Sequence, residues 1–317
     1  MTTLRSFENH AGRREFLRSA LTLGSANALL SDTACAASSK PRLGVVAHAA
    51  SKETAYSGIA RVRELGFSSC QVSVGMSPPG LADTLRQALE RYHVEATAAM
   101  TLGGGGRMVW DFYDGPKTIG IVPPATRQGR IDALKRASDL AKQCGIKAVH
   151  THCGFIPEDP NEPLYKEAVA AIHDVASYCG ANSQQFLMET GQETPITLLR
   201  AINDVGLDNV RVNLDTANLI LYGKGEPVGA LDVLGNYVGG LHAKDGLYPT
   251  NPKQLGTEVP IGKGRVNFVA VIQGLKERKY NGPVTIEREI SGAKQEADIK
   301  DSKKYLEELI DRYYGEA

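Results

Sequence analysis

From Arg42 onward, the chain alternates between short runs rich in apolar and β-branched residues and longer stretches with helical periodicity. Glycines such as Gly66, Gly145 and Gly180 often mark the end of a helical stretch, which is typical of helix C-termini. Such alternation favours parallel strands joined by helices. The eight expected strands cover residues 43–48, 69–74, 94–100, 147–152, 185–189, 210–215, 238–242 and 283–287.

The connections between these strands are long enough to hold helices, and together the eight units predict an α/β fold, a (β/α)8 TIM barrel. A doubly wound open sheet is the main alternative, but His48-Ala-Ala-Ser after the first strand lacks the GxGxxG fingerprint of that fold. No linker or change of composition marks a second domain, so we expect one domain over residues 37–317. The expected helices include residues 53–65, 81–92, 131–144, 165–178 and 298–313.

The first 36 residues differ from the rest. Arg13-Arg14 and Phe16-Leu17 precede a mildly apolar run over residues 19–30, and Ala34-Cys35-Ala36 has the small-x-small pattern of a cleavage site. This arrangement resembles a twin-arginine export signal and predicts a periplasmic or otherwise exported protein. The alternatives are a cytosolic amphipathic tail and a lipidated Cys35, although Asp32 fits a lipobox poorly.

The balance of charged residues argues against a protein that binds nucleic acid. Lys+Arg and Asp+Glu both number 36, whereas proteins that bind nucleic acid usually show a basic excess. We therefore expect a small-molecule substrate and no nucleic-acid partner.

Beyond residue 36, no apolar run is long enough to span a membrane. The remaining cysteines have no CxxC spacing and are expected to be mostly buried thiols: Cys70, Cys144, Cys153 and Cys179.

Four consecutive predicted strands, the fifth to the eighth, each end in a potential metal ligand: Glu189, Asp215, His242 and Glu287. The carboxyl ends of barrel strands converge on one mouth, where three carboxylates would raise one another's pKa. A divalent cation removes that repulsion, and the mixed oxygen and nitrogen set suits Mn²⁺, the expected ion, or Mg²⁺, Co²⁺ or Zn²⁺. Ordinary charged strand ends are the alternative, but they do not account for four matching positions.

The segments around these ligands resemble the xylose-isomerase-like superfamily, within it the sugar-phosphate isomerase and epimerase group. The resemblance covers about residues 42–313. It implies that the four matching residues bind the metal and that Glu189 and Glu287 also act as acid and base. The segments that carry it are Met188–Gly191, Asn213–Thr216, Leu241–Asp245 and Thr285–Glu287, together with Gly262-Lys263-Gly264.

The residue types suit proton transfer next to a carbonyl. Removing that proton leaves an enediolate, which a chelated metal stabilises as a Lewis acid, and two carboxylates can take and return the proton with a gain of roughly 10²–10⁴. We therefore expect a metal-dependent isomerase or epimerase of a sugar or sugar derivative. The alternative is a lyase or dehydratase acting on a keto-sugar or oxidised glycoside, because the same site can eliminate a β leaving group.

Two positions depart from the epimerases. Asn218 stands where many relatives have His, and Gln71 stands on the second strand where many have Glu. Both amides are expected to hydrogen-bond sugar hydroxyls. His150 and His152 share one face of the fourth strand, where they are expected to touch substrate or to be satisfied core residues.

Further candidates lie near the expected mouth. Lys244 is expected to steady an oxyanion or to pair with Asp245, and Glu258 to orient a ligand or a lysine. The long irregular stretch over residues 101–128 is expected to be either a disordered loop or a hinge that brings Trp110 or Tyr113 over the sugar.

Two other functional classes are less favoured. A phosphodiester-cleaving enzyme like endonuclease IV would need extra His and Glu ligands on early strands, where this chain offers only Gln71 and Glu95. A non-catalytic exported sugar-binding protein would not need the complete ligand set. The sequence is compatible with a homo-oligomer.

Overall fold

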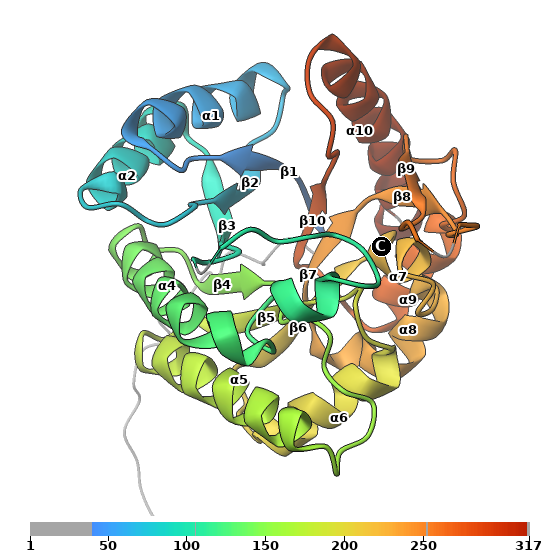
Figure 1. Cartoon of the computed structure of the whole chain (residues 1–317). Coiled ribbons are helices and arrows are strands. Elements are labelled where there is room, and N and C mark those ends of the chain that lie inside the picture. The colour runs from blue at the N-terminus through green and yellow to red at the C-terminus, as the bar shows by residue number, and fades with distance from the viewer. Residues whose placement is uncertain (1–39, 105, 252, 316–317) are drawn as a thin grey trace, which may run out of the picture. The chain divides into compact units, whose positions relative to one another are not determined.

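The computed structural model describes residues 40–104, 106–251 and 253–315. Within them, eight parallel strands close into a barrel in the order β1-β10-β7-β6-β5-β4-β3-β2, with helices outside this ring (Figure 1). The expected (β/α)8 barrel is therefore confirmed. Its strands are β1 (Arg42–His48), β2 (Ser69–Ser73), β3 (Glu95–Met100), β4 (Ala148–Thr151), β5 (Gln185–Glu189), β6 (Val210–Asp215), β7 (Val238–Ala243) and β10 (Pro283–Ile286). The predicted export signal, with Cys35, lies outside the described residues.

Helices join the strands, and several begin with a proline in the first turn, where its fixed φ suits the helix and its missing N–H costs nothing. One such helix, α4, starts at Pro124 rather than at the expected Ile131, because the polar first turn hides the helical period. The helices are α1 (Lys52–Glu64), α2 (Leu81–Tyr92), α3 (Gly115–Thr118), α4 (Pro124–Gln143), α5 (Pro163–Ala181), α6 (Pro195–Val205), α7 (Asn218–Leu221), α8 (Pro227–Leu234), α9 (Phe268–Glu277) and α10 (Ala293–Tyr314), with the 3-10 turn η1 (Gly235–Tyr237).

An antiparallel pair that the sequence did not predict, β8 (Asp245–Leu247) with β9 (Thr257–Val259), is inserted between β7 and β10. Three-residue strands are too short to show a clear alternation. The Asp245 carboxylate anchors the loop that follows: its Oδ2 accepts the backbone N–H groups of Gly262 at 2.9 Å and Gly264 at 2.8 Å. A Cβ at position 264 would lie 2.1 Å from Asp245 Oδ1, so this approach requires glycine.

The core lies between the barrel and its helices. The longer helices each bury one apolar stripe; in α2 this stripe includes Leu81, Leu85 and Leu89. Cys70, Cys153 and Cys179 are buried and Cys144 is half-buried, all as free thiols, which confirms the expectation for most of them. Burial raises the pKa of the Cys70 thiol to about 12, as expected for an inert thiol in an apolar setting.

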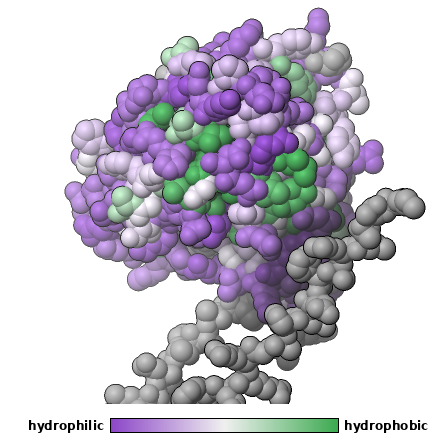
Figure 2. All heavy atoms as spheres, turned by 90° about the horizontal axis from the view of Figure 1, so that it is seen from below, coloured by the Kyte–Doolittle hydropathy of each residue, from purple (hydrophilic) through white to green (hydrophobic). Residues whose placement is uncertain are grey.

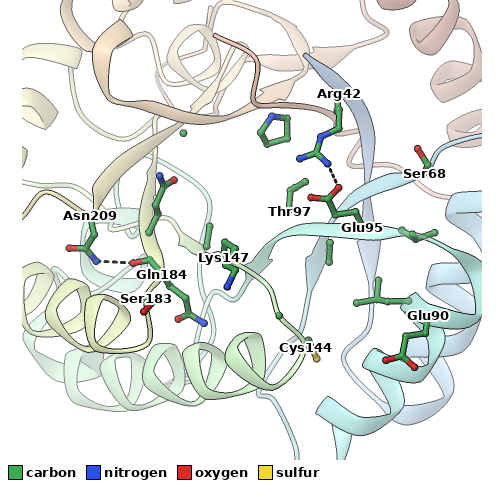
Figure 3. A pocket seen from close by; sticks show the side chains of 18 of the residues that line it. Arg42, Ser68, Glu90, Glu95, Thr97, Cys144, Lys147, Ser183, Gln184 and Asn209 are labelled. Atoms are coloured by element: carbon green, nitrogen blue, oxygen red, sulfur yellow. Dashed lines mark hydrogen bonds and ion pairs between the residues drawn. The ribbon is translucent and has the colours of Figure 1, made fainter. Parts of the chain in front are cut away.

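A cavity of about 1140 Å³ opens at the end of the barrel where the strands begin. Figure 3 shows Arg42 and Glu95 pointing toward one another in it, joined as an ion pair. Nearby, Asn209 Nδ2 donates to the Gln184 carbonyl at 3.0 Å. Active sites of TIM barrels form at the opposite end, so the candidate site lies elsewhere despite the size of this cavity.

The surface in Figure 2 is mostly hydrophilic, with some hydrophobic residues gathered near the middle of that face. Among the residues that the structure describes, the large apolar side chains that are exposed all follow the carboxyl ends of barrel strands, and so lie toward the mouth. Of the helices that the structure describes, none combines the length and the apolarity needed to cross a bilayer. The exposed large apolar side chains near the mouth are Met76, Trp110, Tyr113, Ile196, Leu247 and Tyr248.

Candidate active site

The four expected ligands meet at the mouth of the barrel. Glu189 and Asp215 end β5 and β6, His242 lies near the end of β7, and Glu287 directly follows β10. These strands are neighbours in the barrel, and Asp215 is paired in register with His242. One ligand atom from each residue lies within 4.8 Å of the other three. We call these four residues the ligand cluster.

Asp215 presents one oxygen to the cluster because the backbone holds the other. Its Oδ1 accepts the N–H groups of Ala217 at 2.8 Å and Asn218 at 2.7 Å. Its buried Oδ2 has no hydrogen-bond partner among the described residues, and the Lys244 ammonium lies 3.6 Å from it, beyond hydrogen-bond distance. A buried carboxylate oxygen without a donor is costly, and a cation held by the cluster would satisfy it. This chemistry fits a divalent metal ion.

His242 is held in one orientation by an amide. Its Nε2 lies 2.9 Å from Gln71 Oε1, which can only accept, so in the neutral ring Nε2 carries the proton. As a metal ligand the ring would turn the lone pair of Nδ1 to the cluster, where this nitrogen lies 3.0 Å from Glu189 Oε1 and 3.3 Å from Glu287 Oε2. Burial alone would lower the pKa of His242, but these two carboxylates raise that pKa well above its usual value, so without a metal ion the imidazole is protonated. Gln71 in turn donates to Asn213 Oδ1 at 2.8 Å. The imidazole is thus arranged as metal-binding histidines usually are.

His150 of β4 and His152, which follows that strand, both contact Glu189. Glu189 Oε2 lies 2.8 Å from His150 Nε2 and 3.1 Å from His152 Nε2. His150 is fully buried, whereas His152 is 8% exposed and its ring lies 5.1 Å from that of Trp110. His152 therefore reaches the solvent side of the site and His150 does not. Gln192 was not predicted from the sequence; its Oε1 lies 3.3 Å from the other ring nitrogen of His152, Nδ1.

Lys244 belongs to the site and does not pair with Asp245. Its Nζ lies 3.0 Å from Glu287 Oε2 and 3.0 Å from Glu289 Oε1, while Asp245 accepts backbone N–H groups. Lys244 also donates to Asn218 Oδ1 at 3.2 Å. Glu289 was not predicted, although its position two residues after Glu287 in an extended segment was a usable signal.

Burial and charge act in opposite directions on these groups. Burial alone would raise the pKa of Glu189, but the imidazoles of His152, His242 and His150 outweigh it and hold that pKa well below its usual range. Burial alone would lower the pKa of Lys244, yet Glu287 and the other carboxylates around it raise that pKa well above its usual value. Lys244 therefore carries a buried positive charge beside the cluster.

Asp215 differs from the two glutamates. Burial raises its pKa well above the usual value, Lys244 opposes this rise, and the neighbouring charges of Glu189 and Glu287 add to it. A carboxylate placed beside two others in this way gains from a nearby cation. The electrostatics and the absence of a hydrogen bond to Oδ2 both favour a divalent metal ion.

The site opens into a cavity of about 680 Å³, lined in part by Glu287, His152 and Trp110. The loop that carries Trp110 is described except for Gly105. It is tied down by the buried Arg130, which donates to the carbonyls of Gly104 at 3.1 Å, of Thr118 and of Gly120. Trp110 thus stands at the expected position near the mouth.

The remaining candidates fall into two groups. Gln71, Asn218 and His150 are buried and engaged by His242, Lys244 and Glu189, so their predicted contacts with a substrate stay predictions. Glu258 pairs with Arg288 at 2.9 Å and accepts the backbone N–H of Glu289 at 3.1 Å, so its direct partners are an arginine and the segment after β10.

Comparison with known proteins finds a partial match to one curated protein. An uncharacterized protein of Methanocaldococcus jannaschii is 26% identical over 196 residues, which cover 58% of this chain and 64% of that protein. The match thus spans less than two thirds of the relative's length.

Solved structures extend the likeness to the whole barrel. A xylose isomerase domain protein from Planctomyces limnophilus is 30% identical, with a TM-score of 0.80, over 87% of this chain and 99% of that chain. An L-ribulose 3-epimerase shares the fold at 17% identity, with a TM-score of 0.66, over 86% and 95% of the two chains. The family model of the xylose isomerase-like TIM barrel matches residues 59–309. The chain belongs to the xylose isomerase-like TIM barrel family.

Proposed function

We propose that this protein is a metal-dependent isomerase or epimerase of a sugar or sugar derivative. The observation that carries the proposal is the ligand cluster, in which three carboxylates and one imidazole come within 4.8 Å at the mouth of the barrel. The fold it shares with an L-ribulose 3-epimerase supports the same class of reaction.

The metal would be held by Glu189, Asp215, His242 and Glu287. When bound, a divalent cation would supply Lewis-acid stabilisation of the negative charge that develops on the oxygen atoms of an enediolate. Mn²⁺ is the proposed ion, with Mg²⁺, Co²⁺ and Zn²⁺ as alternatives. Lys244, charged and buried beside Glu287, adds a second positive charge at the same place.

Glu189 and Glu287 are proposed to move the proton. Glu287 reaches the cavity and its side chain is 12% exposed, whereas that of Glu189 is 1% exposed. A proton taken from the carbon next to a carbonyl by one carboxylate and returned by the other, on the opposite face, inverts that carbon. Return to the neighbouring carbon moves the carbonyl instead. His152 and Trp110 line the same cavity and are proposed to contact the sugar.

Deuterium exchange tests this proposal. Metal-loaded protein is incubated with a panel of ketoses and aldoses in D₂O, and NMR follows deuterium in the recovered sugars. We expect deuterium in an unchanged carbon skeleton, and a rate lowered by roughly 10²-fold or more in Glu287→Gln and Glu189→Gln. Glu64→Gln, an exposed change on α1, is the matched control. Absence of exchange from every sugar, or exchange unaffected in both variants, contradicts the proposal. Release of water or an aglycone supports the lyase alternative.

Export through the twin-arginine route is proposed from residues 1–36 alone. Changing Arg13 and Arg14 together to Lys should retain the protein in the cytoplasm, because the paired arginines are the recognised feature. Cell fractionation measures this, with the single change Arg18→Lys as control. Equal export of both variants contradicts the proposed route.

A further inference from the structure

The cavity at the candidate active site continues outward through the helical layer. Its inner end is lined by Glu287, His152 and Trp110, and it extends between α1 and α10, which stand on either side of β1 and β10 in Figure 1. We call this extension the outer groove. It is lined by Val46 of β1, by Ser57, Arg61 and Val62 of α1, and by Gln295 and Ile299 of α10.

The size of the cavity exceeds what one sugar ring needs. Its volume of about 680 Å³ falls within the roughly 300–1,000 Å³ that is typical of pockets for drug-sized ligands. A ring placed with its carbonyl and hydroxyl oxygens at the ligand cluster fills only the inner end. The outer groove then continues the same cavity and stands open beside the bound ring.

We propose that the outer groove binds a second ring attached to the reacting sugar, so that the substrate is a glycoside or disaccharide rather than a free monosaccharide. This inference rests on the proposed function, because the ligand cluster is what places the first ring. It adds a binding site for the part of the substrate that does not react.

The walls of the groove match the chemistry of a ring with apolar faces and a polar edge. Val62 and Ile299 are buried at its floor and Val46 is half-buried, so they offer apolar contact. Ser57 and Arg61 are exposed on α1 and can hydrogen-bond hydroxyl groups at the rim. Sugar rings and aryl groups share this amphipathic character, and pockets for them combine apolar walls with a few polar groups.

Trp110 lines the inner end of the cavity. It contacts His152, with ring centroids 5.1 Å apart, yet 41% of its surface is exposed although its loop is anchored by Arg130. A large aromatic side chain left open beside a polar site offers a stacking face to a ligand ring. Because the chain contains one tryptophan, its fluorescence reports on the inner end of the cavity, where the first ring of any bound sugar would lie.

The test is a fluorescence titration of the Mn²⁺-loaded protein with excitation selective for tryptophan. The probes are the monosaccharide D-fructose and three keto-disaccharides that differ in linkage or second sugar: lactulose, maltulose and isomaltulose. We expect at least one disaccharide to bind about tenfold or more tightly than fructose. Equal or weaker affinity of all three disaccharides overturns the inference.

Variants of the groove separate this effect from general binding. Ser57→Phe on α1 and Gln295→Phe on α10 add bulk from opposite walls, and each should weaken the disaccharide about tenfold while leaving fructose unchanged. Glu64→Phe, also exposed on α1 but outside the groove, is the matched control. If both groove variants keep the wild-type preference and remain folded by circular dichroism, the inference is wrong.

Turnover is not needed for this readout, so the two proposals fail separately. Preferential disaccharide binding without deuterium exchange would leave the groove standing and remove the isomerase assignment. Exchange on fructose with no preference for any disaccharide would do the reverse.

Discussion

His242 Nε2 lies 2.9 Å from Gln71 Oε1, and both side chains are fully buried. The Gln71 amide cannot rotate freely, because its nitrogen donates to Asn213 Oδ1 at 2.8 Å. The amide therefore presents only an acceptor to the imidazole. It fixes which ring nitrogen is protonated, and so which nitrogen is available to the ligand cluster.

We predict that Gln71→Leu weakens Mn²⁺ binding about 10–100-fold, the usual effect of removing the partner that orients a metal-binding histidine. Isothermal titration calorimetry measures the affinity. Gly240→Ala should act in the same direction, since a Cβ there would lie 2.6 Å from Asn213 Oδ1 and 3.2 Å from Gln71 Nε2. Ser69→Ala, at a buried hydroxyl without a hydrogen-bond partner, is the control. Unchanged affinity in Gln71→Leu would show that the amide does not position His242.

Metal binding should stabilise the fold through Asp215. Excess Mn²⁺ at about 100 times its dissociation constant should raise the free energy of unfolding by about 2.7 kcal/mol, because the cation relieves the repulsion among the three carboxylates of the ligand cluster. Asp215→Asn should lose most of this gain. Thermal unfolding with and without Mn²⁺, with EDTA as reference, checks both statements. A melting temperature that is independent of Mn²⁺ in the wild type would argue against a metal site here.

Arg130 should control the order of the loop that carries Trp110. Its guanidinium donates to three loop carbonyls, so Arg130→Met leaves them without a donor, and we expect a loss of about 2–4 kcal/mol in the free energy of unfolding. The fluorescence anisotropy of Trp110 should fall as the loop becomes mobile. Arg136→Met, exposed on the same helix, should change neither quantity. A destabilised variant with unchanged anisotropy would mean that Arg130 supports the helix and not the loop.

Glu193 should make stability depend on pH. Burial raises its pKa to about 8, above the unfolded value, so the folded state binds the proton more tightly. Stability is then full below about pH 4.5 and falls as the pH rises toward about 8, by up to about 1.4 kcal/mol per pH unit. Glu193→Gln should remove this slope in urea unfolding, whereas Glu64→Gln should retain it. Parallel pH profiles for the wild type and Glu193→Gln would contradict the assignment.

Local sequence patterns were sufficient to predict the barrel. The strands that end in Glu189 and Asp215 are short and mostly buried, and their apolar runs stand out between helical stretches. Parallel strands that end at one mouth bring their last residues together whatever the loops do. The ligand cluster could therefore be predicted from the sequence, since it depends on strand ends and not on packing detail.

Short elements, and contacts between segments that lie far apart in the chain, could not be predicted from the sequence. The β8–β9 pair has three residues in each strand, and the first turn of α4 is polar, so neither displays a period. The partnership of Gln71 with His242 links residues 171 positions apart and depends on how two strands face one another across the barrel.

By itself, the sequence determined the barrel, its strand order and the residues at the mouth, because backbone periodicity and the geometry of parallel strands are local or generic. Only the tertiary structure decided the roles of the groups around the cluster. In the structure, Lys244 pairs with Glu287 and Glu289, both His150 and His152 contact Glu189, and Gln71 lies within hydrogen-bond distance of His242. Such choices follow from distances of about 3 Å between side chains of different strands, and no pattern within one strand encodes them.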